Sequence, residues 1–235
     1  SSSVVCRSLH TAQAKGPRAG YDRGSIWEPA ATLLYQRVAP VAPTLHAIER
    51  CRQLTAAHLG YAMPSSKPNF GLRAPANTDA AMVPSPYAVV IPNASRPEKL
   101  WPQSSWIDLT QYLRSQGLNV VVFWGSDAER HLAQEIARDG GGVVPPFLSV
   151  RDAATVLGSA QLILGLDTGL THLGAALGVA TVGIYCDYDP GQAGVTGDGF
   201  HASIGGVGVQ PTVADVKVLV QKALAAVSTK WSHTT

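Results

Sequence analysis

The chain has 235 residues, of which 46% are hydrophobic, and its formal net charge at pH 7 is +2. This length is enough for one complete hydrophobic core and part of a second, and the near-neutral charge argues against a basic nucleic-acid-binding surface, so we expect no nucleic-acid partner. The three cysteines lack the spacing of a metal or redox motif, and no apolar run is as long as a membrane-spanning helix requires.

The first sixty residues are predicted to be helical. Helices are expected over residues 3–14, 28–37 and 45–59, with Thr44 capping the third helix and Gly60 ending it. No stretch in this part has a convincing strand pattern. Because amphipathic helices need a sheet or partner helices to cover their apolar sides, we expect residues 1–60 to be a helical remnant of a larger domain.

A linker and a second domain are predicted to follow. Residues 61–86 are rich in Pro, Ser, Asn and Ala and are predicted to form a linker with one short strand at 70–72. From residue 87 to 228, apolar runs alternate with helical patterns, which predicts a parallel sheet covered on both faces in a Rossmann-like domain. Residues 229–235 are predicted to be a tail.

The elements expected in this second domain can be given by range. The predicted strands are 87–91, 119–124, 142–144, 162–166, 180–185 and 207–209, and the predicted helices are 104–116, 127–138, 149–157, 170–177 and 212–227. Ser104 or Ser105 is expected to cap the first of these helices, and Ser149 is expected to cap the third. Neither Gly-x-Gly-x-x-Gly after the first strand nor a P-loop is present, which argues against an NAD enzyme or a P-loop ATPase.

The most informative stretch is the strand 162–166 and the residues after it. The strand ends at Asp167, and Thr168 and Gly169 then open a helix that carries His172. The carboxyl edge of a parallel sheet is where ligands bind in open α/β folds, and a helix N-terminus suits a phosphate. The alternative is that Asp167 and Thr168 simply cap the helix.

Two further loops are expected at the same edge of the sheet. The loop after the first strand carries Ser95, Arg96 and Lys99, which could hold a diphosphate. Alternatively it is a solvated loop, with Trp101 and Trp106 packed in the core. After the second strand, Asp127 and Glu129 could accept hydrogen bonds from a ribose. The alternative for these two carboxylates is that they complement the dipole of the following helix.

Taken together, these segments carry a resemblance to a known family. The pattern consists of Ser95-Arg96-Pro97-Glu98-Lys99-Leu100-Trp101-Pro102, then Trp124-Gly125 with Glu129, then Asp167-Thr168-Gly169-Leu170-Thr171-His172, then Asp189-Pro190-Gly191, in this order and spacing. This pattern resembles the ADP-heptose glycosyltransferases of family 9, the lipopolysaccharide heptosyltransferases, which have the two-domain GT-B fold. The resemblance implies an α/β protein with a complete C-terminal Rossmann-like domain and part of an N-terminal domain.

The resemblance also implies roles for individual residues. Ser95 and Lys99 match the residues that hold the donor diphosphate, and Glu129 matches the acidic residue on the adenosine ribose. Leu148 matches a position whose neighbourhood packs on adenine. Asp167 matches the carboxylate near the heptose, Thr168 and Gly169 lie beside the diphosphate, and His172 completes the motif. Lys99 and Asp167 are therefore the expected catalytic residues.

Three departures from the family pattern stand out. Ala94 takes the place of a second hydroxyl, and Trp27 takes the place of an arginine. Nothing in residues 1–60 matches the first strand and glycine-containing loop that carry the family's proposed catalytic base. We therefore expect an N-terminally truncated chain that lacks this base and is inactive alone.

The implied function is metal-independent, inverting transfer of L-glycero-D-manno-heptose from ADP-heptose to a Kdo sugar of Kdo2-lipid A. No cofactor or metal is expected. A lipid acceptor implies peripheral work on the cytoplasmic face of the bacterial inner membrane. Two alternatives remain: a heptosyltransferase of the same family that uses a heptose-bearing acceptor, and a nucleotide-binding module without turnover.

Overall fold

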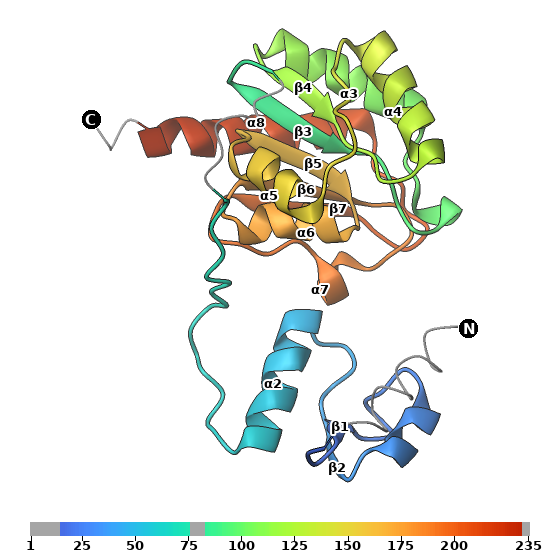
Figure 1. The fold of residues 1–235 in the computed structure, drawn as a ribbon, viewed down its shortest axis with the longest axis vertical. Coiled ribbons are helices and arrows are strands. Elements are labelled where there is room, and N and C mark those ends of the chain that lie inside the picture. The colour runs from blue at the N-terminus through green and yellow to red at the C-terminus, as the bar shows by residue number, and fades with distance from the viewer. Residues whose placement is uncertain (1–14, 76–82, 232–235) are drawn as a thin grey trace. The chain divides into compact units, whose positions relative to one another are not determined.

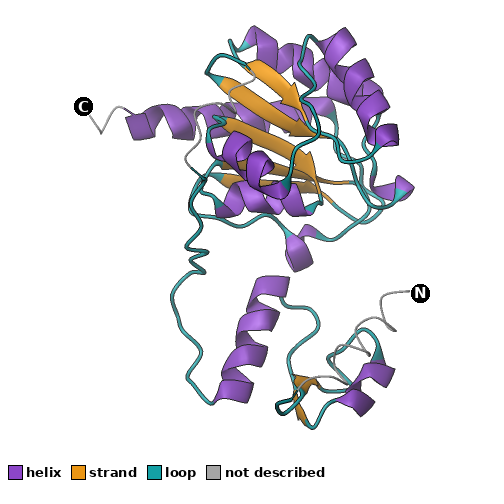
Figure 2. Ribbon diagram, viewed as in Figure 1, coloured by secondary structure: helices purple, strands orange, loops and turns teal. Residues whose placement is uncertain are grey.

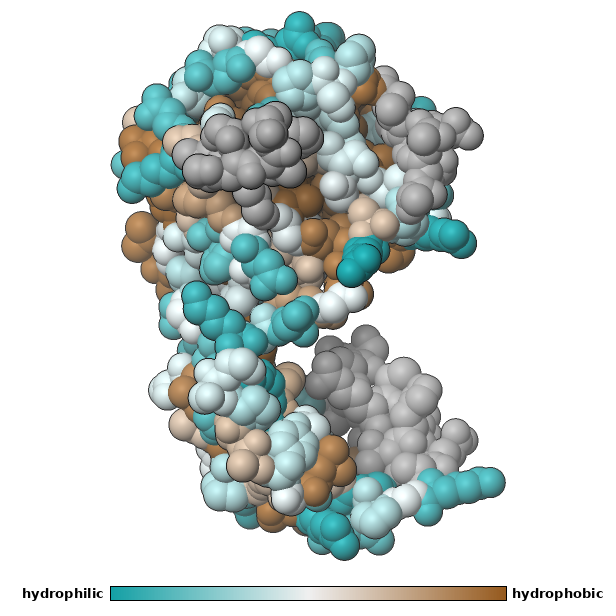
Figure 3. Space-filling model, turned by 90° about the vertical axis from the view of Figure 1, so that its left-hand side faces the viewer, coloured by the Kyte–Doolittle hydropathy of each residue, from teal (hydrophilic) through white to brown (hydrophobic). Residues whose placement is uncertain are grey.

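The computed structural model describes residues 15–75 and 83–231, which form two compact units (Figure 1). One unit contains the described residues up to Pro68 together with 191–193, and the other contains residues 69–190 and those from 194 onward. No helix in the described ranges is long and apolar enough to cross a membrane. On the face displayed in Figure 3, hydrophilic and hydrophobic residues are interspersed.

The first unit contains a small parallel sheet that the sequence analysis missed. Strand β1 (Ala19–Tyr21) pairs with β2 (Arg37–Ala39). The helix predicted over 28–37 is wrong in its second half: a 3-10 helix, η1 (Pro29–Leu34), is followed by extended backbone. Both Gln36 and Arg37 donate their backbone N–H groups to Arg18 O, so strand pairing takes over where the predicted helix would continue.

Helix α2 (Ala47–Leu59) corresponds to the third predicted helix. Thr44 is not its cap: His46 holds the N-cap position, and its Nδ1 accepts a hydrogen bond from the Ile48 N–H at 3.3 Å. Gly60 ends the helix as predicted, in the left-handed conformation with φ 72°, which glycine adopts without steric cost. The helix predicted over 3–14 lies outside the described residues.

The segment after α2 has no regular structure in its described part. Residues 61–75 contain no helix or strand, so the short strand predicted at 70–72 is wrong. Three prolines and one glycine lie within residues 61–75, and they interrupt the strand ladder that this run would need.

The second unit is built on a five-stranded parallel sheet. Its strands are β3 (Tyr87–Ile91), β4 (Asn119–Val122), β5 (Leu162–Leu166), β6 (Ala180–Tyr185) and β7 (His201–Gly205), and their spatial order is β4-β3-β5-β6-β7. At the β4 edge, Val143 adds one parallel bridge to Val121, where a strand was predicted over 142–144. Counting that bridge as the third strand gives the 3-2-1-4-5-6 order of a Rossmann fold. The predicted Rossmann-like domain is confirmed.

The last predicted strand is misplaced. Residues 207–209 form a tight turn, with an antiparallel bridge between Gly206 and Val209, whereas the strand that pairs with β6 is His201–Gly205. Gly205 and Gly208 have φ values of 100° and 66°, so the backbone turns on both sides of Val207. Because β7 reads His-Ala-Ser-Ile-Gly and is only partly buried, it lacks the apolar run that marked the other strands.

Helices cover both faces of this sheet (Figures 1 and 2). On one face lie α3 (Gln103–Ser115), α4 (Asp127–Gly140) and α8 (Val213–Trp231), and on the other lie α5 (Val150–Gly158) and α6 (Gly169–Ala176). The short η2 (Pro97–Lys99) and α7 (Pro190–Ala193) occupy loops. The largest fully buried side chains include Trp106 and Leu109 on the first face and Leu157 and Ile163 on the second.

Several helix ends differ by one to four residues from the predicted bounds. Helix α3 begins at Gln103 behind Pro102, and neither Ser104 nor Ser105 caps it. Helix α8 begins at Val213 and continues to Trp231, beyond the predicted end at 227. In contrast, Ser149 caps α5 as predicted, because its Oγ accepts a hydrogen bond from the Asp152 N–H.

Candidate functional site

The candidate site lies at the carboxyl edge of the sheet, where β3 and β5 are neighbours. In the Rossmann strand order this is the point at which successive connections run in opposite directions, and ligands bind in the crevice it creates. The loops after β3, β4 and β5 line a cavity of about 680 Å³ there, which is within the size range of small-molecule sites. Its lining residues are Ile91, Asn93, Ala94, Ser95, Phe123, Trp124, Gly125, Glu129, Val150, Thr168, Gly169, Leu170 and Leu173.

The structure divides the predicted site residues into two adjoining groups. Ser95, Glu129, Thr168 and Gly169 line the cavity. Lys99, Asp167 and His172 form a charged cluster beside it, since Lys99 follows Ser95 in the same loop and Asp167 directly precedes Thr168. Leu148 is not among the described residues that line the cavity. It packs against the core on the face of the sheet that α5 and α6 cover.

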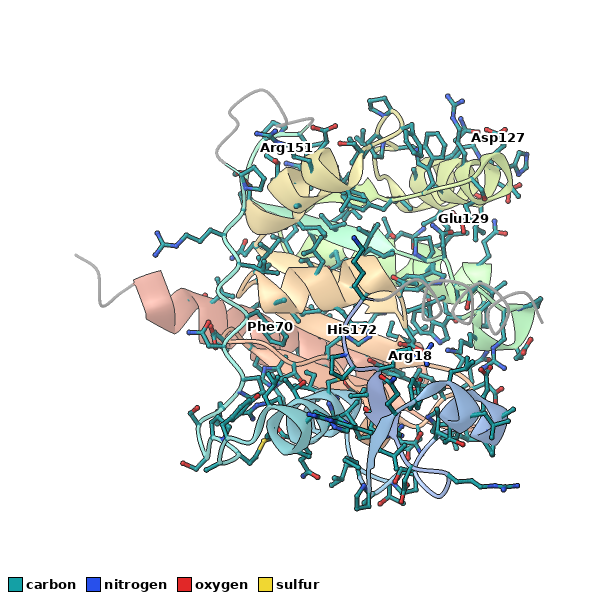
Figure 4. The ribbon with its side chains drawn as sticks, turned by 60° about the horizontal axis from the view of Figure 1, so that its bottom comes forward. Arg18, Phe70, Asp127, Glu129, Arg151 and His172 are labelled. Carbon is teal, nitrogen blue, oxygen red and sulfur yellow. The ribbon has the colours of Figure 1, made fainter. Side chains whose placement is uncertain are left out.

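The charged cluster is held by short contacts to one carboxylate. Lys99 Nζ lies 2.7 Å from Asp167 Oδ2, and His172 Nε2 lies 3.2 Å from Asp167 Oδ1. The side chains of Lys99 and Asp167 are only 11% and 16% exposed. His172 comes from the first turns of α6 and is labelled in Figure 4. Both oxygens of Asp167 are therefore occupied by cluster side chains.

These contacts decide the charge of Asp167. Burial alone raises the pKa of this carboxyl group, but the hydrogen bonds from His172 and Lys99, together with the positive charge of Lys99, hold its pKa below the usual value. Asp167 is consequently a carboxylate at neutral pH. Nearby, burial and then the negative charge of Asp167 raise the pKa of Tyr185, which stays protonated.

The loop that presents Lys99 is fixed by its neighbours in sequence. Lys99 ends the 3-10 turn η2, and two residues later Trp101 is 4% exposed and packs edge-to-face on Trp106, with ring centroids 5.0 Å apart. The Trp101 Nε1–H donates to Pro211 O at 2.9 Å. Burial of Trp101 and Trp106 is what the solvated-loop interpretation expected, and the same burial leaves Lys99 in a defined place beside Asp167.

The simple capping interpretation of Asp167 and Thr168 is not what the structure has. Thr168 occupies the N-cap position of α6 but makes no side-chain cap hydrogen bond among the described residues. Its Oγ1 instead lies 3.2 Å from Thr171 Oγ1, which donates to Leu166 O at 2.7 Å. The first turn of α6, which borders the cavity at Gly169 and Leu170, is thus left without a side-chain cap. Uncapped N–H groups at a helix N-terminus suit an anion.

Gly165 and Gly169 lie on either side of the connection between β5 and α6, and each lacks a side chain for a different reason. A Cβ on Gly165 would clash with the Thr171 hydroxyl and meet Ile91 Cβ at 3.0 Å, so this glycine is required by packing inside the protein. A Cβ on Gly169 would meet nothing within 4 Å. The small residue at Gly169 therefore leaves open space at the helix N-terminus, on the wall of the cavity.

Glu129 serves the backbone as well as the cavity. Its Oε2 accepts hydrogen bonds from the N–H groups of Gly125 and Ser126, at 2.8 and 3.0 Å, and Ser126 completes a capping box for α4. Glu129 and Asp127 lie at the same end of this helix (Figure 4), so both complement its dipole as the alternative interpretation expected. The predicted contact of Glu129 with a ribose stays a prediction.

Sequence reasoning missed two residues of this region. Asn93 follows β3 by two positions, lines the cavity and donates from Nδ2 to Phe123 O at 3.0 Å. Tyr188, in the loop after β6, places its ring centroid 4.4 Å from Lys99 Nζ. For Asn93 the signal was its place at a strand end, whereas Tyr188 directly precedes the Asp189-Pro190-Gly191 motif and has no sequence signal of its own. In the described ranges no cluster of three or more His, Cys, Asp or Glu side chains could hold a metal ion.

Comparison with known proteins now decides the family. Residues 3–219 match the model of glycosyltransferase family 9 (heptosyltransferase). The chain belongs to this family. The family 9 assignment and the GT-B fold predicted from the sequence motifs are thereby confirmed.

Named relatives of this family 9 chain come from several bacteria. It is 39% identical over 184 residues to lipopolysaccharide heptosyltransferase 1 of Pseudomonas aeruginosa, covering 78% of this chain and 52% of the relative. It is 35% identical over 192 residues to the protein of the same name from Salmonella typhimurium, covering 81% and 61% of the two chains. The chain thus spans about half to three fifths of the length of these relatives.

Solved structures give the same picture. The family 9 chain matches the E. coli heptosyltransferase WaaC solved with ADP, with a TM-score of 0.77 and 32% identity, over 94% of this chain and 70% of that one. WaaC solved with ADP-2-deoxy-2-fluoro heptose matches with a TM-score of 0.71 over 92% and 69% of the two chains.

Proposed function

We propose that this chain is the nucleotide-sugar-binding part of a heptosyltransferase that transfers L-glycero-D-manno-heptose from ADP-heptose to a Kdo residue of Kdo2-lipid A. Family membership and the WaaC structures with ADP and an ADP-heptose analogue support the donor. The names of the lipopolysaccharide heptosyltransferase 1 relatives support the acceptor class. Because this acceptor is linked to a lipid, the transfer would take place at a membrane surface, and we propose that the protein associates peripherally with the cytoplasmic face of the inner membrane.

The observation that carries this proposal is the Lys99–Asp167 pair beside an uncapped helix N-terminus. In glycosyl transfer from a nucleotide sugar, negative charge builds on the departing diphosphate. The Lys99 ammonium and the first turn of α6 supply positive charge where the diphosphate would lie, and groups fixed before the reaction stabilise such charge most effectively. Asp167 holds Lys99 in place and remains ionised, as its lowered pKa requires.

The cavity next to this cluster would take the adenosine. Ser95 and Thr168 offer hydroxyl donors toward phosphate oxygens, and Glu129 has a second carboxylate oxygen, Oε1, beyond the Oε2 used by the capping box. Trp124 is fixed beside them, since its Nε1–H donates to Pro145 O at 2.7 Å and its ring meets Phe147 edge-on. An apolar wall with a few polar groups is the usual composition of a nucleotide pocket.

Titration calorimetry on the 235-residue chain tests this proposal. We expect ADP to bind, UDP and GDP to bind more weakly, and Lys99→Ala to lower the affinity for ADP at least tenfold. Lys222→Ala is the matched control, because it removes a lysine of the same chain on α8 and should leave the affinity unchanged. Equal affinity for all three diphosphates, or unchanged ADP affinity in Lys99→Ala, would contradict the proposed donor site.

A further inference from the structure

The Lys99 ammonium is enclosed by residues from three neighbouring strand ends. Lys99 itself stands in the loop after β3, Asp167 directly follows the central strand β5, and Tyr188 lies in the loop after β6. Nζ lies 2.7 Å from Asp167 Oδ2 and 4.4 Å from the centroid of the Tyr188 ring. With 11% of its side chain exposed, this lysine has lost most of the water that an ammonium group normally holds.

The ion pair with Asp167 holds the Lys99 ammonium from one side only. A lysine side chain is a flexible chain of four carbons that ends in a compact charge, and this charge attracts an anion equally well from many directions. The face of an aromatic ring attracts a cation within about 6 Å of its centroid, and the attraction grows when water is excluded. The Tyr188 ring therefore defines a second side of the ammonium position, where the carboxylate defines only the first.

We propose that Tyr188 is a positioning residue, which holds the Lys99 ammonium toward the donor diphosphate by the face of its ring. This inference rests on the proposed function, since it assumes that Lys99 meets a diphosphate. The ring face, not the phenolic hydroxyl, carries the effect, so phenylalanine should replace tyrosine and an aliphatic side chain should not. A tyrosine that merely packed the loop would act on stability without regard to the phosphates of the ligand.

Binding of ADP and AMP to the 235-residue chain separates these roles. AMP lacks the second phosphate, so a displaced Lys99 should affect ADP more than AMP. We expect Tyr188→Leu to weaken ADP binding about threefold to thirtyfold, the range for a partly desolvated cation–π contact, with a smaller change for AMP. Tyr188→Phe should bind both nucleotides like the wild type.

A double-mutant comparison tests whether Tyr188 acts through Lys99. In a Lys99→Ala background, Tyr188→Leu should have no further effect on ADP affinity, because the cation that the ring positions is gone. Tyr112→Leu is the matched control: Lys217 Nζ lies 5.1 Å from the Tyr112 ring centroid, in another lysine–tyrosine pair that is formed between α3 and α8. This control should leave the ADP-to-AMP affinity ratio unchanged.

The outcomes distinguish the two proposals. A wild-type chain that does not bind ADP overturns the proposed function and this inference with it. ADP binding that is equal in wild type and Tyr188→Leu, or that falls equally in the Lys99→Ala background, overturns the role of Tyr188 alone. If Tyr188→Leu does not fold, Tyr188→Met gives the same comparison with a flexible aliphatic side chain, and an unchanged ADP-to-AMP ratio in that variant counts against the inference.

Discussion

Replacing Asp167 by asparagine is the substitution that tests the charged cluster most directly. Asparagine has nearly the same shape, keeps one acceptor oxygen and caps helices about as well as aspartate. It removes the negative charge that faces Lys99 Nζ at 2.7 Å and His172 Nε2 at 3.2 Å. Any effect of this variant therefore reports on the charge and hydrogen bonds of the carboxylate and not on capping or volume.

The magnitude follows from burial and contact geometry. Hydrogen bonds to charged groups contribute about 1.5–3 kcal/mol each, whereas exposed ion pairs contribute about 0.2–1 kcal/mol. Because the Lys99 and Asp167 side chains are 11% and 16% exposed, we expect Asp167→Asn to lower the free energy of unfolding by about 1.5–3 kcal/mol at pH 7. Urea denaturation followed by circular dichroism measures this difference.

The direction of the Asp167 pKa shift decides how this stability difference changes with pH. The pKa of Asp167 is lowered in the folded protein, so its stabilising effect is complete above the unfolded-state pKa of about 3.9 and disappears as pH falls through the lower folded-state pKa. The stability difference between wild type and Asp167→Asn should shrink as the pH falls below 4. The control is Asp127→Asn at the exposed start of α4, expected to cost about 0.3–1 kcal/mol. Equal unfolding curves for wild type and Asp167→Asn at pH 7 would refute the reasoning.

Three further predictions concern the same edge of the sheet. Lys99→Arg should retain more ADP affinity than Lys99→Ala in calorimetry, because arginine keeps the charge but not the geometry; equal loss in both would show that charge is not what Lys99 contributes. Gly165→Ala should lower the free energy of unfolding by about 1–3 kcal/mol through its clash with Thr171, whereas Gly169→Ala should leave stability unchanged or raise it yet weaken ADP binding; a Gly169→Ala chain that binds ADP normally would show that the open space holds no ligand. Glu129→Gln should preserve the melting temperature, since glutamine also completes a capping box, while Glu129→Ala should cost about 1 kcal/mol; loss of ADP affinity in Glu129→Gln alone would locate a ligand contact on the carboxylate charge.

How far the sequence predicts the fold depends on the strength of local patterns. The buried strands β3, β5 and β6 are continuous apolar runs, and their predicted bounds are those of the structure. Strands β1 and β2 have three residues each, which is too short for a recognisable hydrophobic pattern. Arg37–Ala39 is a strand because it pairs with Ala19–Tyr21, and this pairing cannot be read from the sequence. The prediction missed β7 for the same reason, because its pairing with β6, and not its composition, makes it a strand.

The site residues that could be predicted are reactive side chains in the loops that follow predicted strands. Asp167 and Lys99 were named from their positions, and the parallel topology brings them into contact. The sequence could not show that Asp167 would use both oxygens on side chains instead of capping α6, because that depends on the register between β3 and β5. It also could not place Tyr188 over Lys99, since cation–π contacts between loops carry no sequence spacing.

The hydrogen bond from Trp101 to Pro211 links residues that are 110 positions apart. Gln210 adds a second link, from its Nε2 to Leu100 O at 3.2 Å. The segment that leads into α8 therefore fixes the loop that carries Lys99, and the final helix supports the proposed donor site. Shortening this protein from its C-terminus, for crystallisation or fusion, would loosen a lysine that lies at the opposite end of the domain's sequence.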